Sequence, residues 1–415
     1  MKNLGDVGAE PAFRRDVRAD FPILGRSIDG HAITYLDSAA TSLKPRSVIE
    51  AVTSYFTRGG ANIHRGKHYL SEEVSDRYET GRLRVAQLLG CFGNEVVFTR
   101  NTTEAINLVA AGLGLSTDDV VITTLESHHS QQLPWRRLAK TLMVRCDKDG
   151  NAELGHFEEL LRLHPKVVAL THCSNVTGVF APVQQMASLA RAAGAIVVVD
   201  AAQSVAHRRV NVEELGADFL AFSSHKMLGP SGLGVLYGRR EMLEKLRPLS
   251  IGGGTVDWVD LEGYRLRKVP HRLESGTPSI EGVYGLLAAI EYLEDLGFDA
   301  VSAHDSYLAA RMVALAADRP YLKVLGSTTG ADRAAVLSLE IPGLDNLSEI
   351  ARSLSDSYGI MCRSGHLCAQ ALVDSMSSGE VLRASAYLYN TAGEIDRLFL
   401  ALDELCRLAG VAQTL

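Results

Sequence analysis

The feature that most limits how this chain can fold is a repeated alternation of apolar runs with helical segments from about residue 95 onward. The runs are short and rich in β-branched residues, and helical periodicity returns between several of them, as in 103–112 and 183–193. Continuous apolar strands that alternate with helices predict a mostly parallel sheet covered by helices on both faces. The predicted strands are Val96–Phe98, Val120–Thr123, Val167–Leu170, Ile196–Val199, Phe219–Phe222 and Val235–Tyr237.

The pattern changes after about residue 285, where a long helical segment leads into a mixed region that includes a predicted strand at 335–341. We therefore predict an α/β chain with two domains and an N-terminal arm. Residues 37–285 form the large domain, 286–415 form a smaller C-terminal α+β domain, and 1–36 form an arm that packs with the small domain.

Composition narrows the function classes. The net charge is −7, which argues against a nucleic-acid partner, because such proteins usually carry a basic excess. No apolar run approaches the length of a membrane span, and the first 24 residues lack the apolar core of a secretory signal. We expect a cytoplasmic protein that binds neither nucleic acid nor membrane.

Polar residues follow each predicted strand. Because ligands bind beyond the carboxyl ends of parallel strands, these residues are expected to face one site. A single acidic residue at a strand end is usually a turn or cap, but successive clusters are harder to explain that way. The clusters are Asn101–Glu104, Glu126–His129, Thr171–Asn175, Asp200–Gln203 and Ser223–Lys226.

Lys226 lies between two apolar strands, immediately before a glycine-rich turn at 229–234. Burial there would lower the pKa of the amine and make it a nucleophile and a base, as a Schiff-base lysine requires. The alternative is a lysine that extends from a strand end to solvent. This stretch alone favours neither interpretation, whereas the neighbouring clusters favour the first.

Together the clusters match the needs of pyridoxal phosphate (PLP). Lys226 would hold the cofactor as an imine, and Asp200 would pair with its ring nitrogen. His128 could stack on the ring, and Gln203 could reach its hydroxyl group. A phosphate would suit the helix N-terminus at Thr102 and Thr103, with Ser223 and His225 as further donors. The chain has no GxxxxGK[ST] or GxGxxG motif, so nucleotide binding is disfavoured.

Cys368 differs from the other cysteines in its surroundings. It follows Arg363-Ser364-Gly365-His366-Leu367, which we interpret as a flexible loop whose basic groups favour a thiolate. A core cysteine more often sits in an apolar run, as Cys406 does. A second basic loop, with His64 and Arg65, is either a solvated surface or the wall of an anionic site.

At this level of detail the chain resembles the class V aminotransferase group of fold-type I PLP enzymes, and within it the Suf-type cysteine desulfurases and selenocysteine lyases. The resemblance covers nearly the whole chain. The matching segments are Tyr35–Ala40, His64–Gly66, Thr102–Val109, His128–Trp135, Ser174–Gly178, Val199–Ser204, Ser223–Gly234, Glu274–Pro278, Arg363–Ala369 and Arg383–Thr391.

The resemblance implies a role for each matched residue. Lys226 carries PLP, whereas Asp200, Gln203 and His128 hold its ring. Cys368 takes up sulfur as a persulfide. It implies a homodimer in which Thr277 completes the phosphate site of the partner subunit. The residues expected to bind the cofactor are Thr102, Thr103, His128, Asn175, Asp200, Gln203, Ser223, His225, Lys226 and Thr277. The residues expected to bind substrate are Asn175, Arg363, Arg383, His64 and Arg65. Lys226, Cys368 and His128 are expected to be catalytic, and no metal ligand is expected.

The expected activity is conversion of L-cysteine to L-alanine with transfer of sulfur to Cys368 and then to an acceptor protein. Three positions depart from the family pattern: Leu367 and Ala371 near the cysteine, and Gln131 near the cofactor. They leave other activities open, namely a carbon–sulfur lyase, a selenocysteine lyase, an epimerase or a deaminating enzyme. A noncatalytic PLP-fold scaffold would lack Lys226 or Asp200, and both are present.

Overall fold

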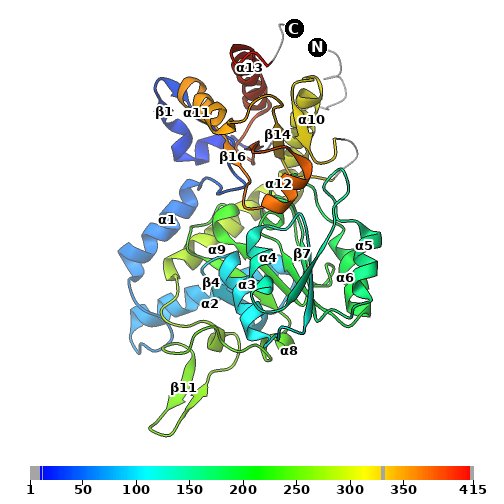
Figure 1. The fold of residues 1–415 in the computed structure, drawn as a ribbon. Coiled ribbons are helices and arrows are strands. Elements are labelled where there is room, and N and C mark those ends of the chain that lie inside the picture. Colours follow the sequence, from blue (N-terminus) through cyan, green and yellow to red (C-terminus); the bar gives the residue numbers. More distant parts are fainter. Residues whose placement is uncertain (1–9, 12, 329–331, 412–415) are drawn as a thin grey trace.

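The computed structural model describes residues 10–11, 13–328 and 332–411, and a seven-stranded sheet forms its centre (Figure 1). The strand order is β4-β10-β9-β8-β7-β5-β6, and β10 is antiparallel to both of its neighbours. The sheet is therefore mostly parallel, as predicted. Its strands are β4 (Val96–Thr99), β5 (Val120–Thr124), β6 (Lys140–Val144), β7 (Val167–Thr171), β8 (Ile196–Asp200), β9 (Phe219–Ser223) and β10 (Gly234–Gly238).

Six of these strands are confirmed to within about one residue at each end, whereas β6 was not predicted. Its sequence, Lys-Thr-Leu-Met-Val, has no continuous β-branched run. It forms the edge of the sheet, where only Val144 is fully buried. An edge strand needs less apolar sequence than a central one, so the signal was weak.

Helices cover both faces of the sheet. Alternate residues of a strand point to opposite faces, so Val197 and Val199 of β8 join the core under one layer and Val198 joins the core under the other. The first core includes residues of α2 (Tyr69–Leu89), α5 (Leu154–Leu161), α6 (Val183–Ala192) and α9 (Ile280–Leu296). The second includes residues of α3 (Thr102–Gly112), α4 (His129–Arg136) and α8 (Arg240–Leu243). Across the described ranges, no helix has both the length and the apolar character needed to cross a bilayer.

The C-terminal part is built on a second sheet with strand order β13-β14-β17-β16. Its separate core includes α10, α11 and α13, and Leu36 from the N-terminal segment. The predicted boundary at 285/286 falls inside α9, which packs against α1 (Arg46–Ser54) and α2 along the large sheet's side. The elements are β13 (Lys323–Leu325), β14 (Val336–Glu340), β16 (Arg363–Gly365), β17 (Val381–Ser385), α10 (Phe298–Ala317), α11 (Leu347–Tyr358), α12 (Gln370–Met376) and α13 (Ala392–Leu408).

The N-terminal segment is joined to the C-terminal part by a short parallel pair, in which β3 (Thr34–Tyr35) pairs with β15 (Ile360–Met361). Arg18 extends this connection by donating to the carbonyl of Tyr389 at 2.7 Å and pairing with Glu394 at 2.9 Å. These contacts place the segment from Arg18 to Tyr35 beside the C-terminal part (Figure 1).

Candidate active site

A cavity of about 570 Å³ lies where the carboxyl ends of the parallel strands meet the C-terminal part. Each of the five strand-end clusters contributes residues to its wall, and the cluster Glu126–His129 contributes His128. The predicted residues in its wall are Thr102, Thr103, His128, Asn175, Asp200, Gln203, Ser223, His225, Lys226, Arg363, Cys368 and Arg383. The structure thus brings twelve predicted residues together in one chain.

Lys226 ends a single 3-10 turn, Ser224–Lys226, that directly follows β9. The carbonyl of His225 in that turn accepts from the Ser42 backbone N–H and from the Lys44 amine, both at 3.0 Å. Burial lowers the pKa of Lys226 to about 8, although the nearby charge of Asp200 raises it. Near neutral pH, Lys226 therefore has a much larger share of free amine than an exposed lysine, as a nucleophile and base requires.

The glycine-rich turn that follows Lys226 ends against the N-cap of α3 because of one glycine. A Cβ on Gly234, at the start of β10, would lie 2.5 Å from the Cα of Asn101. Only glycine allows this approach of two backbones. Gly234 therefore lets the end of the turn lie beside the N-terminus of α3.

Asp200 lies at the end of β8 and is 6% exposed. Burial raises the pKa of its carboxyl group, while the Ala202 backbone N–H, which donates at 2.8 Å, and the charge of Lys226 act in the opposite direction. A buried carboxylate is stabilised by a positively charged partner. Asp200 is therefore suited to a protonated ring nitrogen.

The N-terminus of α3 forms a polar corner of the cavity. Ser223 Oγ accepts from the Thr102 backbone N–H at 2.9 Å, and the two hydroxyl oxygens are 2.7 Å apart. Thr103 Oγ1 lies 2.7 Å from Ser130 Oγ. Several hydroxyl groups at a helix N-terminus, where the dipole is positive, are suited to a phosphate.

His128 is the N-cap of α4, and its Nδ1 accepts from the Ser130 backbone N–H at 3.1 Å. Burial lowers the pKa of the imidazole to about 4, with a further contribution from the charge of Lys226. The ring is therefore neutral at physiological pH. A neutral ring fixed in orientation is suited to stacking on an aromatic ligand.

Arg383 and Arg363 meet at a carboxylate that sequence reasoning did not single out. Asp37 accepts from Arg383 at 3.0 Å and from Arg363 at 2.9 Å. It lies within the segment 35–40, which matches the family pattern but to which no site residue was assigned. Its position just after the short strand β3 was the only local sign that it could face the site.

Two buried polar atoms of the cavity wall have no hydrogen-bond partner in the part of the chain that the structure describes. They are Arg383 Nε and Asn175 Oδ1. A buried donor or acceptor without a partner costs about 1–3 kcal/mol, so such atoms indicate that a polar ligand belongs here.

The Cys368 loop makes hydrogen bonds with two neighbouring segments. Asn175 Nδ2 donates to the carbonyl of Leu367 at 2.8 Å, and the His129 backbone N–H donates to the carbonyl of Cys368 at 2.8 Å. Cys368 itself is exposed, and it is a free thiol. The Cys368 thiol is therefore accessible, and its backbone is held by neighbouring segments.

The departure at Leu367 has a structural reason. Its side chain is only 8% exposed and packs in an apolar cluster with Val176, Leu372 and Val381. A leucine there anchors the loop, whereas a histidine would bring a polar ring into the cluster. The other two departures lie outside the cavity lining: Gln131 donates to the carbonyls of Leu170 and Val198, and Ala371 is the second residue of α12.

Replacement of Leu367 by alanine is expected to reduce the free energy of unfolding by about 2–4 kcal/mol, because it leaves a cavity in the apolar cluster. Denaturant titration measures the change. Leu163→Ala is the matched control, because Leu163 is 52% exposed and its replacement should change stability by less than about 0.5 kcal/mol. Equal losses in the two variants would contradict the anchoring role.

His64, Arg65 and Thr277 do not reach the Lys226 cavity of their own chain. They line a second cavity of about 280 Å³ together with Arg267 and His271. Asn62 links the basic loop to the other side by donating to Thr277 Oγ1 at 3.4 Å. The structure therefore groups these three predicted residues, but at a separate place.

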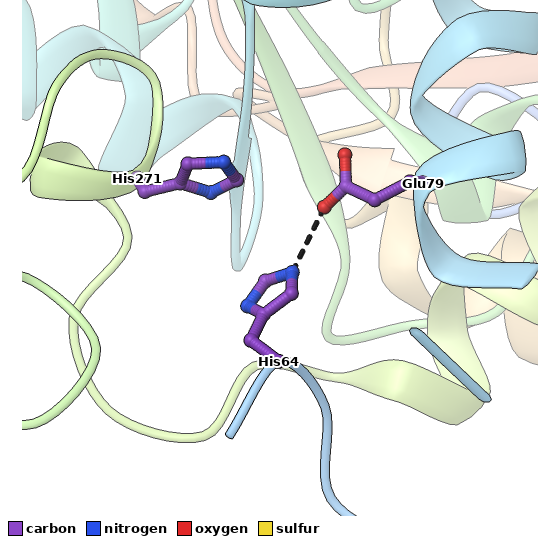
Figure 2. Close-up of side chains that lie close together, drawn as sticks. All are labelled: His64, Glu79 and His271. Carbon is purple, nitrogen blue, oxygen red and sulfur yellow. Dashed lines mark hydrogen bonds and ion pairs between the residues drawn. The ribbon is translucent and has the colours of Figure 1, made fainter. Parts of the chain in front are cut away.

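Next to this second cavity, His64 Nε2 lies 2.9 Å from Glu79 Oε1, and the ring of His271 lies close to both residues (Figure 2). Two imidazoles and a carboxylate are a metal-type ligand set, but Arg82 donates to the other Glu79 oxygen at 2.8 Å. The wall of the cavity holds Arg65 and Arg267 against one carboxylate, Glu274, which is already paired with Arg82, so the local charge favours an anion over a metal cation.

Comparison with known proteins agrees with this architecture. The family model described as aminotransferase class-V matches residues 34–398, so the chain belongs to the class V aminotransferase family. Enzymes of this family are PLP-dependent and adopt the fold-type I architecture, a mostly parallel sheet between helical layers with a smaller region beside it.

Particular relatives make the likeness more specific. A probable cysteine desulfurase of Halalkalibacterium halodurans is 40% identical over 94% of this chain and 97% of its own length. A cysteine desulfurase of Haloferax volcanii is 38% identical over 93% of this chain and 95% of its own.

Solved structures of cysteine desulfurases are also similar to this chain. The apo cysteine desulfurase from Thermococcus onnurineus NA1 superposes with a TM-score of 0.89 at 38% identity, covering 96% of this chain and all of that one. The cysteine desulfurase CsdA from Escherichia coli gives a TM-score of 0.85 at 34% identity, over 94% of this chain and 98% of that one.

Proposed function

We propose that this chain is a PLP-dependent cysteine desulfurase. The reaction takes L-cysteine and the Cys368 thiol to L-alanine and a Cys368 persulfide, so that the carbon–sulfur bond breaks and a sulfur–sulfur bond forms. The observation that carries the proposal is that Lys226 and Cys368 line the same cavity. The relatives named above support it.

The residues present fit PLP. Lys226 would be the attachment point, Asp200 would pair with the ring nitrogen and His128 would stack on the ring. Gln203, whose amide donates to the carbonyl of Ala39 at 2.9 Å, lines the same cavity and would face the ring hydroxyl group. The phosphate group belongs at the α3 N-terminus, with the hydroxyl groups around Ser223. When bound, PLP supplies an electron sink that stabilises negative charge on the substrate carbon.

The remaining steps fall to side chains of this chain. Arg383 binds the substrate carboxylate, using the buried Nε that has no partner in the described residues. The Lys226 amine, once free, removes the α-proton of the substrate. The Cys368 thiolate attacks the substrate sulfur, and the electron pair of the carbon–sulfur bond stays with the carbon, which is protonated to give alanine.

Cys368 is exposed, so a second protein can reach the persulfide and take the sulfur. All six cysteines are free thiols, which suits the reducing cytoplasm.

We further propose a homodimer in which His64, Arg65 and Thr277 complete the site of the partner subunit. They form an anion-favouring cavity apart from their own Lys226. Next to it, Arg65 donates at 3.0 Å to the carbonyl of Val256 in a projecting hairpin, β11 (Val256–Val259) and β12 (Tyr264–Leu266) (Figure 1). Trp258, Leu261 and Tyr264 of this hairpin are exposed apolar side chains of the kind that a partner subunit covers.

The shared site is tested by mixing subunits. Lys226→Ala and Arg65→Ala homodimers should each be impaired, whereas mixed dimers should regain activity, because one site then combines an intact Lys226 with an intact Arg65 from the other chain. Turnover after refolding the mixture measures the gain, with each variant refolded alone as the control. No gain in dimers of confirmed mixed composition would mean that Arg65 acts within its own chain.

The function itself is tested by supplying L-cysteine and measuring alanine, sulfide and the mass of Cys368. A desulfurase gives alanine and, without a reductant, an added sulfur atom on Cys368. A carbon–sulfur lyase instead gives pyruvate and ammonia with an unmodified enzyme. Parallel assays with L-selenocysteine establish which chalcogen is preferred.

A further inference from the structure

His129 makes two contacts with the segment that carries Cys368. Its backbone N–H donates to the carbonyl of Cys368 at 2.8 Å, and its Nε2 accepts, at 3.4 Å, from the N–H of Gln370. His129 directly follows His128 and is the first residue of α4. One helix start therefore contacts both the cofactor pocket and the nucleophile loop.

The backbone of this loop needs such support. Leu367 and Cys368 both have φ of +55°, a left-handed conformation that residues with a Cβ rarely adopt. Two such residues in succession are strained and persist only where the surroundings impose this conformation. Here the surroundings are the buried Leu367 side chain, the bond from Asn175 and the bonds to His129.

We propose that His129 is a positioning residue that fixes Cys368 over the cavity, a role that deepens the proposed function and rests on it. The N–H groups of a first helical turn have no partner within their helix, so the His129 N–H is free to bind the Cys368 carbonyl. The imidazole holds the next segment, because Gln370 begins α12. Together the two contacts set the distance of the thiol from the substrate sulfur.

Two substitutions separate the two contacts. His129→Ala keeps the backbone N–H and removes the ring, whereas His129→Pro removes both and places a ring carbon where the Cys368 carbonyl oxygen lies. Proline is tolerated at the first position of a helix. The preceding residue, His128, has φ −59° and ψ 151°, which a following proline permits.

Hydrogen exchange gives a readout that is independent of turnover. In the PLP-loaded protein, amide exchange in the peptide 366–372 should accelerate in His129→Ala, because Gln370 loses its acceptor, and accelerate further in His129→Pro. In a single turnover with L-cysteine, formation of the Cys368 persulfide should fall by about 10²-fold in His129→Pro, the scale expected for a misplacement of about 1 Å. The cofactor absorbance and the affinity for PLP should stay as in the wild type.

His156→Ala is the matched control, because His156 Nδ1 also accepts a backbone N–H, that of Arg145 at 3.0 Å, far along the chain from Cys368. It should leave exchange at 366–372 and persulfide formation unchanged. The proposal is overturned if His129→Pro stays within about twofold of wild type in both measurements, or if its main effect is loss of PLP affinity. If His129→Pro does not fold, His129→Ala decides: unchanged exchange and unchanged persulfide formation overturn the proposal.

The two levels of the proposal fail in different ways. A wild-type protein that forms no persulfide would refute the proposed desulfurase, but exchange at 366–372 would still report whether His129 holds the loop. Wild-type persulfide formation with unchanged exchange and unchanged rates in the variants would refute the positioning role alone.

Discussion

Replacement of Cys368 by serine is expected to abolish persulfide formation and to reduce alanine release by at least about 10³-fold, which is about 4 kcal/mol of barrier. A hydroxyl group is a far weaker nucleophile than a thiolate, and it cannot form a persulfide. The loop should keep its structure, because its hydrogen bonds involve the backbone of Cys368 and not its sulfur. PLP binding and substrate affinity should therefore be preserved.

The measurement combines intact-protein mass, alanine production and the cofactor spectrum. Cys91→Ser is the control, because Cys91 is a free thiol outside the cavity lining and its replacement should leave turnover near wild type. Full turnover of cysteine by Cys368→Ser would exclude direct sulfur transfer. The carbon–sulfur lyase would then be the better interpretation.

Replacement of Lys226 by methionine is expected to eliminate turnover, because it removes both the attachment point of the cofactor and the base. The visible absorbance of bound PLP should shift or disappear. The loss should exceed that of Asp200→Asn, in which the attachment point remains. A Lys226→Met protein with an unchanged spectrum and full activity would refute the assignment.

The same substitution should stabilise the cofactor-free protein. The pKa of Lys226 falls from 10.5 when unfolded to about 8 when folded, so the charged amine is disfavoured by folding. This destabilisation, about 3 kcal/mol at most, is fully present below pH 8 and fades as the pH rises from 8 toward 10.5. The gain from Lys226→Met in thermal or denaturant unfolding should therefore be largest near pH 7 and small above pH 10.

The parallel sheet and the Lys226 cavity were predictable because their signals are local. Each central strand is a continuous apolar run, and each is followed by the polar residues that face the site, as Val199-Asp200 illustrates. The rule that these residues meet at one edge then placed Thr102, Asp200 and Lys226 together without any knowledge of loop geometry.

Other features depend on contacts between distant segments, and no local pattern shows them. Asp37 pairs with arginines more than 300 residues further along the chain. The burial of Leu367 and the bonds from Asn175 and His129 follow from docking of the C-terminal part on the sheet, so the loop looked flexible in the sequence. Thr277 was assigned to a partner subunit only by family resemblance, because no local pattern in a sequence marks a contact between two chains.

The pairing of Asp37 with Arg383 and Arg363 bears on how the site discriminates among ligands. Before a substrate arrives, both guanidinium groups already hold a carboxylate, so their orientation needs no reorganisation. An incoming carboxylate must exchange with an internal competitor or share the arginines with it. The attraction that it gains is then a difference between two similar ion pairs, so we expect modest affinity for any carboxylate. An amino acid would be retained mainly by its attachment to the cofactor, and acids without an amine would leave quickly.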